Sequence, residues 1–414
     1  MIHFDEERGR WLKPMRKGDW KLIQELNRSI ILNKIRLDGP ISRIELAKGN
    51  RISPSTVAAA VQELIREGYV TEIGRGESSG GRKPILLQFA PDNHFLFAAS
   101  ISNTVIEVAQ MNLEASILRK ESASVGTRQG EAVIELMLGM IDRFTDETGS
   151  LDRCIGIAVT TPGVVNVEQG VVYYNSKLRL NDVPVKQMVE SRYGIKTWVE
   201  NDTNSLVLAE RRFGSYSSFA NLIYLMVGNG VGAGILVNDM ILRGNLGGAG
   251  EFGHTSVNRS GIRCECGNVG CLENSVSWPA VHSRMMAAMA SGRPTMIHDL
   301  TDGDFSRIEP AVYKDALSKQ DRLAMDITEE IAEHLGAGIV NLVNLFNPGA
   351  IVIGGNVAQD NPILLEKVEE HISRYAMRIL KDDLVVGQSS LGDDGKLIGA
   401  AAIVLQDLFQ FSLT

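Results

Sequence analysis

The sequence predicts a small N-terminal module of helices and one β-hairpin, followed by a two-lobed α/β body. Three observations indicate this fold class: short amphipathic helices with two strands near the N-terminus, a strand plan that occurs twice in the body, and a change of charge between the two parts. The length of 414 residues favours about three structural units. We expect the module over residues 1–90, a first lobe over 95–200 that is completed by a C-terminal helix over 398–414, and a second lobe over 201–397.

The charge of the chain divides unevenly between these parts. Residues 1–90 hold 16 Lys and Arg against 11 Asp and Glu, a balance of +5. The totals of 42 and 50 leave 26 against 39, or −13, for the remainder. A basic module on an acidic body favours binding of a polyanion by the module.

The first residues of the chain and its long uncharged stretches bear on its cellular location. The first residues are charged and lack the apolar run that a signal peptide needs. Two long uncharged stretches, 221–238 and 335–359, are interrupted by glycines and by Asn347-Pro348, so they predict buried elements joined by turns. We therefore expect a cytoplasmic protein with no membrane partner.

Three helices are predicted in the basic module. Residues 20–37 carry apolar side chains at helical spacing, and an Asp-Gly-Pro sequence ends this helix. Ser42, with Glu45 three positions later, forms a capping box that begins a short second helix. Ser53 caps the third helix, and Pro54 stands at its first position, where a missing amide hydrogen costs nothing.

The third helix has the properties of a DNA recognition helix. Its buried stripe is formed by four apolar residues, Val57, Val61, Leu64 and Ile65. Two helices joined by a short turn, the second with small and polar residues facing outward, match the geometry that enters the major groove. Strand-like segments over 69–73 and 85–89 flank a basic turn, which predicts a wing suited to phosphate or minor-groove contacts. We expect contacts with double-stranded operator DNA from Ser53, Ser55, Thr56, Gln62, Arg75, Arg82 and Lys83.

A small helical bundle used for protein contacts is the alternative for this module. The helix geometry and the charged wing together favour DNA. Ala58, Ala59 and Ala60 make the centre of the third helix poor in hydrogen-bond donors, so base contacts would rely on thymine methyl groups and on the flanking polar side chains. Because a pseudo-palindromic operator matches a two-fold protein, we expect a homodimer or a dimer of dimers.

The acidic body contains the same plan of strands twice. The predicted strands are residues 95–101, 105–111 and 115–118 in the first set, and 221–227, 231–237 and 240–242 in the second. A repeat of this kind indicates a duplicated α/β lobe, and two facing lobes enclose a site between them. Apolar spacing over 331–346 predicts a late helix, and 350–353 a buried strand.

Three of the four cysteines lie close together behind a histidine. Cys264, Cys266 and Cys271 follow His254 in the chain. Three thiolates and one imidazole are typical ligands of tetrahedral zinc, and they leave no coordination position for water or substrate, so we predict a structural Zn site. Free thiols on a glycine-rich loop are the alternative, but clustered thiols without a secretory signal seldom lack a metal or redox role. Cys154 lies in an apolar run typical of the core.

Four motifs of the body carry a resemblance to one family. They are Glu200-Asn201-Asp202-Thr203-Asn204, Gly228-Asn229-Gly230-Val231-Gly232-Ala233-Gly234, Gly247-Gly248-Ala249-Gly250-Glu251-Phe252-Gly253-His254, and the cysteine motif ending in Cys271-Leu272-Glu273. In these motifs the chain is similar to the ROK family of repressors, uncharacterised reading frames and sugar kinases. The resemblance implies an actin-like, RNase H-like α/β fold for the two lobes. The helix-turn-helix module and the wing sequence Ser78-Ser79-Gly80-Gly81-Arg82-Lys83-Pro84 resemble the xylose-repressor-like branch.

The resemblance also implies a sugar cleft beside the zinc motif in the second lobe. The implied sugar-binding residues are Asn201, Asp202, Glu251, His254 and Glu273. His254 would give one ring nitrogen to zinc and turn the other toward the sugar. An uncharged polyhydroxylated ligand needs several fixed donors and acceptors, which these residue types provide. The segment 175–184 corresponds to a sugar-facing loop that commonly carries a tryptophan, and this chain has none there.

The resemblance to kinases is weaker at the nucleotide site. Family kinases hold ATP phosphates with an Asp-x-Gly-Gly-Thr turn, and the equivalent here is Ser100-Ile101-Ser102-Asn103-Thr104. The acidic residue that would organise magnesium and both glycines are replaced. Phosphoryl transfer depends on positioning and charge neutralisation, so we predict no enzymatic activity and no catalytic residue. Asp202, at the family's catalytic-base position, would bind without catalysing. The glycine-rich turn 228–232 remains, but it also has a purely conformational explanation.

These observations predict a sugar-responsive transcriptional repressor of carbohydrate-utilisation genes, which a free sugar such as xylose or glucose would release or modulate. Sugar binding would change the angle between the lobes, and the zinc loop would transmit this change to the spacing of the DNA-binding modules. An active sugar kinase that phosphorylates a hexose or an amino sugar with ATP is the first alternative. A repressor controlled by another protein is the second.

Overall fold

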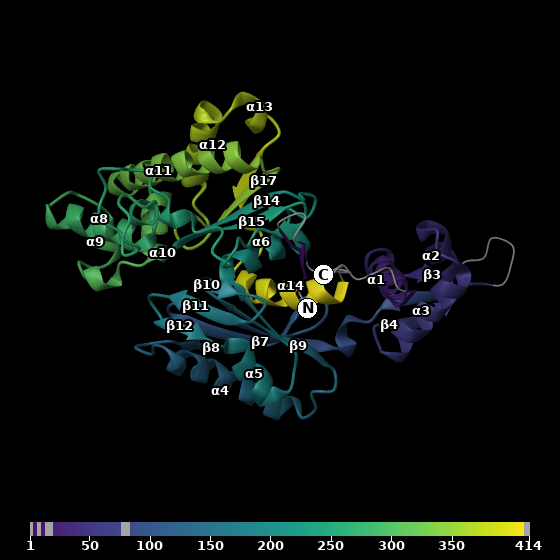
Figure 1. The fold of residues 1–414 in the computed structure, drawn as a ribbon. Helices are drawn as coiled ribbons and strands as arrows, with labels where there is room; N and C mark the ends of the chain where they lie inside the picture. The colour runs from purple at the N-terminus through teal and green to yellow at the C-terminus, as the bar shows by residue number, and fades with distance from the viewer. Residues whose placement is uncertain (1–2, 6–9, 13–19, 76–82, 410–414) are drawn as a thin grey trace.

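The computed structural model of the protein describes residues 3–5, 10–12, 20–75 and 83–409. Figure 1 shows a small head to one side and two α/β lobes, one above the other, with helix α14 (Gly395–Phe409) between them. Arg82, which we predicted to contact DNA, lies outside the described residues.

The head consists of three helices and a three-stranded sheet. Its elements are α1 (Trp20–Asp38), β3 (Ile41–Ser42), α2 (Arg43–Asn50), α3 (Pro54–Arg66), β4 (Val70–Arg75) and β5 (Ile85–Phe89). The antiparallel sheet has the order β3-β5-β4. Ser42 and Glu45 form the capping box, and Ser53 caps α3 with Pro54 in the first turn. A separate hairpin of β1 (His3–Asp5) and β2 (Arg10–Leu12) precedes the head.

The first lobe is built on a five-stranded sheet with the order β13-β9-β6-β7-β8. A three-stranded sheet, β10-β11-β12, is inserted between β9 and α5. The elements are η1 (Pro91–Asn93), β6 (Phe95–Ile101), β7 (Val105–Met111), β8 (Ile117–Ser124), α4 (Glu131–Thr148), β9 (Cys154–Thr161), β10 (Val164–Asn166), β11 (Val171–Asn175), β12 (Leu180–Val183), α5 (Val185–Tyr193) and β13 (Thr197–Asn201).

The second lobe has a five-stranded sheet with the order β16-β15-β14-β17-β18. Its strands are β14 (Leu222–Val227), β15 (Val231–Val237), β16 (Met240–Ile241), β17 (Ala350–Gly354) and β18 (Val385–Gln388). Its helices are α6 (Asp202–Arg212), η2 (Phe252–His254), α7 (Glu273–Val276), α8 (Trp278–Ala290), α9 (Ile297–Leu300), η3 (Phe305–Arg307), α10 (Pro310–Ser318), α11 (Arg322–Phe346), α12 (Pro362–Tyr375) and α13 (Arg378–Lys381).

The predicted repeat of strands is confirmed by the pairing. Read from the edge formed by β13, the first sheet has two parallel pairs followed by two antiparallel pairs, and the second sheet has the same pattern from β18. Several strand boundaries differ from the prediction: β8 runs from Ile117 to Ser124 instead of over 115–118, β14 begins at Leu222, and β16 ends at Ile241. Ala115 has a φ of 57°, which belongs to a turn and not to a strand.

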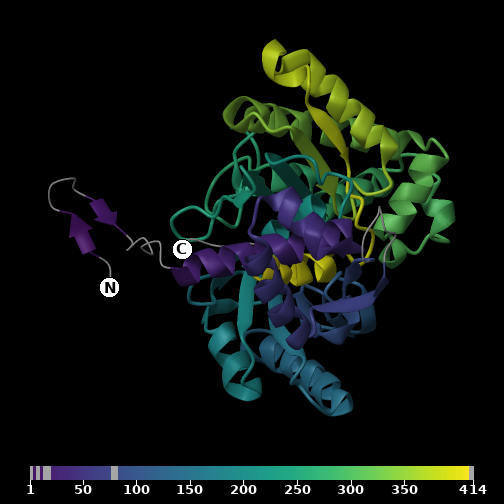
Figure 2. The ribbon, with the colours of Figure 1, turned by 90° about the vertical axis from the view of Figure 1, so that its right-hand side faces the viewer.

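The head and the first lobe share one continuous apolar core. Ile35 of α1 and Leu64 of α3 belong to the same buried cluster as Leu96 of β6 and Leu405 of α14. Phe409, at the end of α14, packs edge-on against Phe89 of the head with ring centroids 5.8 Å apart. Figure 2 shows α1 lying beside α14. The head is therefore packed onto the body and not only tethered to it.

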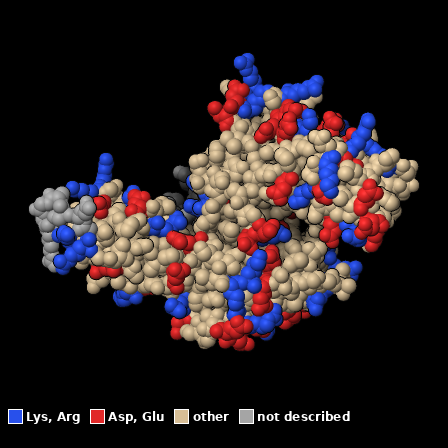
Figure 3. Space-filling view, turned by 180° about the vertical axis from the view of Figure 1, so that it is seen from behind, with Lys and Arg blue, Asp and Glu red and all other residues tan. Residues whose placement is uncertain are grey.

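Charged side chains of both signs are interspersed over the face of the lobes in Figure 3. None of the helices in the described part of the chain is long and apolar enough to cross a membrane.

The shared core predicts a large effect of Phe409→Ala. The ring is 8 % exposed, and removal of a buried phenylalanine ring costs about 3 kcal/mol or more. Urea unfolding should show this loss. Leu345→Ala is the control, because Leu345 is 75 % exposed and surface truncations stay within about 0.5 kcal/mol. Equal stabilities of the two variants would contradict the shared core.

Candidate functional site

Helix α3 presents several of the predicted DNA-contacting residues on the surface of the head. Ser55 and Gln62 are exposed, as are Ala58 and Ala59. Ser53 is committed to capping, because its Oγ accepts a hydrogen bond from the Thr56 amide at 3.2 Å and lies 2.8 Å from Thr56 Oγ1. Gln62 is a long polar side chain on this face that takes no part in the cap.

A groove on the head runs between α3 and the first wing strand, β4. Ala58, Gln62, Thr71, Glu72 and Arg43 are among the residues that line it. The Arg43 Nη2 donates to Glu72 Oε1 at 2.8 Å across this groove. Arg43 is not among the DNA-contacting residues predicted from the sequence. Its position directly after Ser42, the capping residue of α2, is the sequence feature that could have pointed to it.

The described wing residues are basic and open to solvent. Arg75, the last residue of β4, is exposed, and Lys83 is exposed just before β5. Both flank the same hairpin turn, and Arg75 is paired with Ile85 at the start of β5. Cations at this position can contact phosphates in either groove of a duplex.

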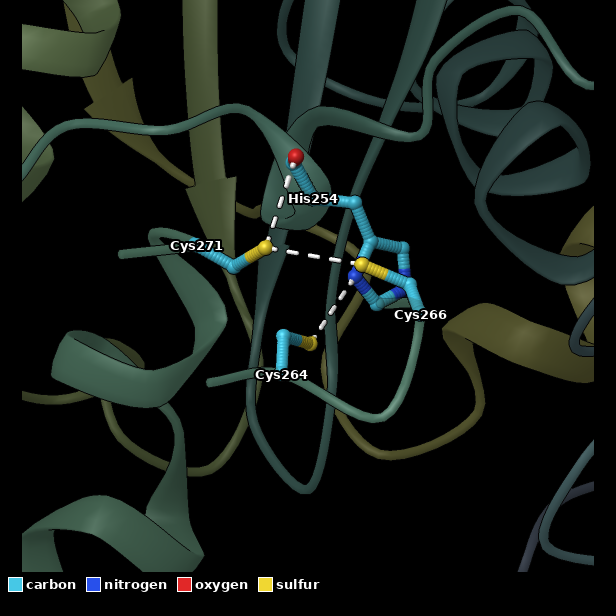
Figure 4. Close-up of side chains that lie close together, drawn as sticks. All are labelled: His254, Cys264, Cys266 and Cys271. Carbon is cyan, nitrogen blue, oxygen red and sulfur yellow. Dashed lines mark hydrogen bonds between the residues drawn. The ribbon is translucent and has the colours of Figure 1, made fainter. Parts of the chain in front are cut away.

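The predicted metal ligands come together in the second lobe. His254, Cys264, Cys266 and Cys271 place one ligand atom each within 4.8 Å of the others. His254 Nδ1 lies 3.6 Å from Cys264 Sγ, and the sulfurs of Cys266 and Cys271 are also 3.6 Å apart (Figure 4). Two thiolates at zinc–sulfur distances of ~2.3 Å in a tetrahedron would lie about 3.8 Å apart. The donor set and its spacing therefore fit a four-coordinate metal ion.

Local turns hold the cysteines in this arrangement. His254 ends the short helix η2, and isolated bridges pair Ser256 with Cys271 and Arg263 with Val269. Gly270 has a φ of 72°, and a Cβ there would lie 1.6 Å from the Asn258 carbonyl oxygen. Burial, together with the neighbouring thiols, raises the pKa of Cys271. Metal binding must therefore displace a proton from this thiol.

Asn201 and Asp202 lie at the start of α6, where the first lobe passes into the second. Asn201 caps α6, because its Oδ1 accepts hydrogen bonds from the amides of Thr203 at 2.9 Å and Asn204 at 3.1 Å. Its Nδ2 donates to the Gly163 carbonyl at 3.0 Å, which leaves the second amide hydrogen available for a ligand. Burial raises the pKa of Asp202, although nearby Lys396 acts in the opposite direction.

Glu251, Glu273 and His254 converge on the same region. Burial raises the pKa of Glu251, His254 opposes this shift, and the charges of Asp202 and Glu273 raise it further. His254 Nε2 lies 3.9 Å from Glu251 Oε2, whereas its Nδ1 faces the cysteines. Glu273 Oε2 accepts from the Val231 amide at 2.8 Å. Asp202, Glu273 and His254 thus all lie close enough to Glu251 to affect its charge, and His254 is also one of the metal ligands.

The segment 175–184 of the first lobe contacts the second lobe. Residues 176–179 form the turn between β11 and β12. Ser176 Oγ donates to Glu265 Oε1 at 3.2 Å, and Lys177 Nζ donates to the Asn229 carbonyl at 2.9 Å. The turn therefore bridges the metal loop and the glycine-rich turn of the second lobe.

The turn between β6 and β7, within residues 100–104, is closed by its own side chain. Ser102 Oγ accepts from the amides of Thr104 at 3.4 Å and Val105 at 3.0 Å. Its hydroxyl donates to the Val105 carbonyl at 2.8 Å. These amides are consumed within the turn, so they are not presented to a ligand.

Comparisons with known proteins show the family of the chain. A model of the ROK family matches residues 98–407, and a model of winged helix-turn-helix DNA-binding domains matches residues 27–71. The chain belongs to the ROK family. A curated xylose repressor of Caldicellulosiruptor bescii is 31 % identical over 396 residues, which cover 95 % of this chain and 99 % of the repressor.

Two solved structures show how far the ROK likeness extends. A ROK family transcriptional regulator, described as a homolog of the E. coli MLC protein, matches with a TM-score of 0.84 and 29 % identity, over 95 % of this chain and 98 % of the other. A ROK family glucokinase from Streptomyces griseus, in complex with glucose and AMPPNP, matches with a TM-score of 0.66 and 26 % identity. The match covers 98 % of that kinase but 75 % of this chain.

The raised pKa of Asp202 predicts that Asp202→Asn stabilises the protein at pH 7. A carboxyl with a raised folded-state pKa is costly to ionise above that pKa, and the cost disappears as pH falls through it. The advantage of the variant should therefore shrink as the pH is lowered toward about 4, as urea unfolding across this range would show. Asp299→Asn is the control, because that side chain is 89 % exposed. A variant less stable than the wild type at pH 7 would refute the assignment.

Proposed function

We propose that this ROK protein is a sugar-responsive DNA-binding repressor of carbohydrate-utilisation genes. The observation that carries the proposal is the match to a repressor and to a transcriptional regulator along 95 % of the chain, head included. The donors and acceptors around Asp202 support the sugar response, because an uncharged sugar is bound by several fixed hydrogen-bonding groups. The effector is a free sugar, with xylose and glucose as the first candidates.

The proposed DNA contacts divide into two kinds. Ser55, Gln62 and the exposed methyl groups of Ala58 and Ala59 face base edges, with Ser53 and Thr56 at the helix start near the backbone. Arg75, Arg82 and Lys83 of the wing contact phosphates or the minor groove, and Arg43 joins them when it leaves Glu72. Two heads of a homodimer, or of a dimer of dimers, read a pseudo-palindromic operator in the cytoplasm.

The proposed sugar site uses the five residues named above, and zinc occupies the His254 and cysteine cluster. Zinc has a structural role, because four protein ligands leave no open position. It fixes the His254 ring, so that Nε2 stays directed toward Glu251 and the sugar. The metal therefore supports sugar binding without taking part in any reaction.

Coupling to DNA follows from how the parts are packed. We divide the chain into a head over 1–90, a first lobe over 95–200 with the C-terminal helix, and a second lobe over 201–397. Since the head and the first lobe share a core through α14, they move as one body. Sugar binding would then shift the second lobe, and α6, which bears Asp202 and packs on α14, lies at the moving boundary. This shift changes the relative position of the two heads in a dimer.

An active sugar kinase is the alternative, and the likeness to a glucokinase favours it. Against it stand the missing acidic residue and glycines at 100–104 and the amides of Thr104 and Val105 that Ser102 occupies. Without that clamp the γ-phosphate of ATP has no aligned partner. A coupled ADP-release assay with glucose, xylose and N-acetylglucosamine separates the two, and steady turnover would establish the alternative.

Zinc analysis by mass spectrometry tests the metal assignment. The wild type and the matched control Cys154→Ser should each retain one zinc ion per chain, whereas Cys264→Ser/Cys266→Ser should lose it. Because binding energy at a structural zinc site is also folding energy, the double variant should melt roughly 5 °C or more below the wild type. A double variant with full zinc content would exclude this ligand set.

Sugar-dependent DNA binding tests the proposed function. A duplex selected from random sequences should bind the wild type, and the effector sugar should weaken this binding at least about fivefold. Asp202→Ala should bind the duplex but lose the sugar response, because it removes acceptors of the sugar site. Leu345→Ala should behave like the wild type. Unchanged affinity for the duplex in the presence of sugars that demonstrably bind would reject the proposal.

A further inference from the structure

Glu200 is a buried carboxylate directly before Asn201 and Asp202. It is 1 % exposed and lies next to the end of β13. Its Oε1 accepts hydrogen bonds from the Asn201 amide at 3.0 Å and from Asn204 Nδ2 at 3.2 Å. A charge without access to water is tolerated only when it is paired and fully hydrogen-bonded.

The partner of Glu200 comes from the second lobe. Arg243 Nε at 2.9 Å and Nη2 at 2.7 Å both donate to Glu200 Oε2. Arg243 follows β16, so the pair joins residues far apart in the chain across the boundary between the lobes. The Arg243 side chain is 37 % exposed, which gives the pair one buried and one partly solvated member.

Arg243 also begins the loop that ends at Glu251. The Ala249 amide donates to the Arg243 carbonyl at 3.0 Å, which closes residues 243–249 into a compact loop. Gly247 of this loop lies against β10, because a Cβ there would be 2.0 Å from the Val165 carbonyl oxygen. At the far end, the Ala233 amide donates to the Gly250 carbonyl at 2.8 Å. Arg243 and the residue before Glu251 are therefore the two ends at which this loop is held.

We propose that Glu200 and Arg243 are positioning residues for the sugar site, which set the distance between Asn201 and Asp202, where the first lobe passes into the second, and Glu251 of the second lobe. This inference rests on the proposed function, because it presumes that these residues bind a sugar. Stability alone does not account for the pair, since apolar residues of similar volume often replace a buried ion pair without loss. The pair instead orients the sugar-binding residues, because Glu200 precedes Asn201 and Asp202 in the chain and also binds Arg243, at the start of the loop that ends at Glu251.

The experiment compares Arg243→Ala and Arg243→Lys with the matched control Arg211→Ala. Arg211 belongs to α6 and pairs with Asp239 through its Nε, so its loss also breaks an arginine–carboxylate pair in this region. Calorimetry with xylose, glucose and N-acetylglucosamine measures sugar affinity. Residues that orient ligating side chains contribute ten- to a hundredfold to affinity at metal sites, and we expect about a tenfold loss of sugar affinity for Arg243→Ala.

Three further readouts separate positioning from general destabilisation. Zinc content and sugar-free DNA affinity of Arg243→Ala should match the wild type, and Arg243→Lys should recover part of the sugar affinity, because it retains the charge but not the two-donor geometry. Arg211→Ala should bind sugar like the wild type. Wild-type sugar affinity in Arg243→Ala, or equal losses in Arg243→Ala and Arg211→Ala, would overturn the inference. If Arg243→Ala fails to fold, the affinity of Arg243→Lys decides, and a value equal to the wild type overturns it.

Hydrogen exchange keeps this test independent of the proposed function. Amides of residues 243–251, that of Ala249 above all, should exchange faster in Arg243→Ala than in the wild type or Arg211→Ala. If the wild type binds no sugar, the proposed function fails, and faster exchange still supports the positioning of the loop by Arg243. Unchanged exchange in this loop overturns the inference even if the wild type binds sugar.

Discussion

The packing of α14 is the constraint on which the other parts of the structure depend. This helix contacts the first-lobe strands β6 and β9, the helix α6, and α1 of the head. Gly399 faces Ser205 so closely that a Cβ would lie 2.7 Å from its Oγ, and Phe409 inserts into the core of the head. One helix therefore links the element that carries Asp202 to the module that carries the recognition helix. Close packing of this kind transmits displacement because a packed interface has few alternative arrangements.

The second feature is a concentration of carboxylates at the boundary of the lobes. Burial raises the pKa of both Asp202 and Glu251, and the charges of Asp202 and Glu273 raise the pKa of Glu251 further, so ionisation of these carboxyl groups is costly in the unliganded site. Sugar hydroxyls would relieve part of this cost by donating to the carboxylates. Such a site sacrifices stability for ligand binding, as functional sites commonly do. The metal ligands and the Glu200–Arg243 pair hold its members in place from two sides.

Much of the architecture follows from local signals in the sequence. The capping box at Ser42, the Ser53-Pro54 start of α3 and the duplicated strand plan each have a short-range physical cause, and the structure has all three. The approach of Cys264, Cys266 and Cys271 to His254 was also predictable, because spacing and residue type suffice for a metal cluster.

Contacts between distant segments could not be predicted in this way. Nothing near Arg243 in the sequence indicates that Glu200 will be its partner, since lobe packing alone brings them together. The same holds for the docking of Phe409 on α1 and for Arg43 in the groove of the head. Ser53 and Thr56 show a different limit: their polarity suggested DNA contact, and the structure also uses both in the cap of α3. Residue type alone does not distinguish a capping role from a recognition role.

The central claim is that one protein links a sugar site to a DNA-binding head through a shared packing core. Because sugar binding and DNA binding are thermodynamically linked, the most direct test is calorimetry. The effector sugar is titrated into the protein alone and into the protein saturated with operator duplex. The account predicts that the duplex weakens sugar binding by the same factor by which the sugar weakens duplex binding. Identical sugar affinities with and without the duplex, for a protein that binds both, would contradict it.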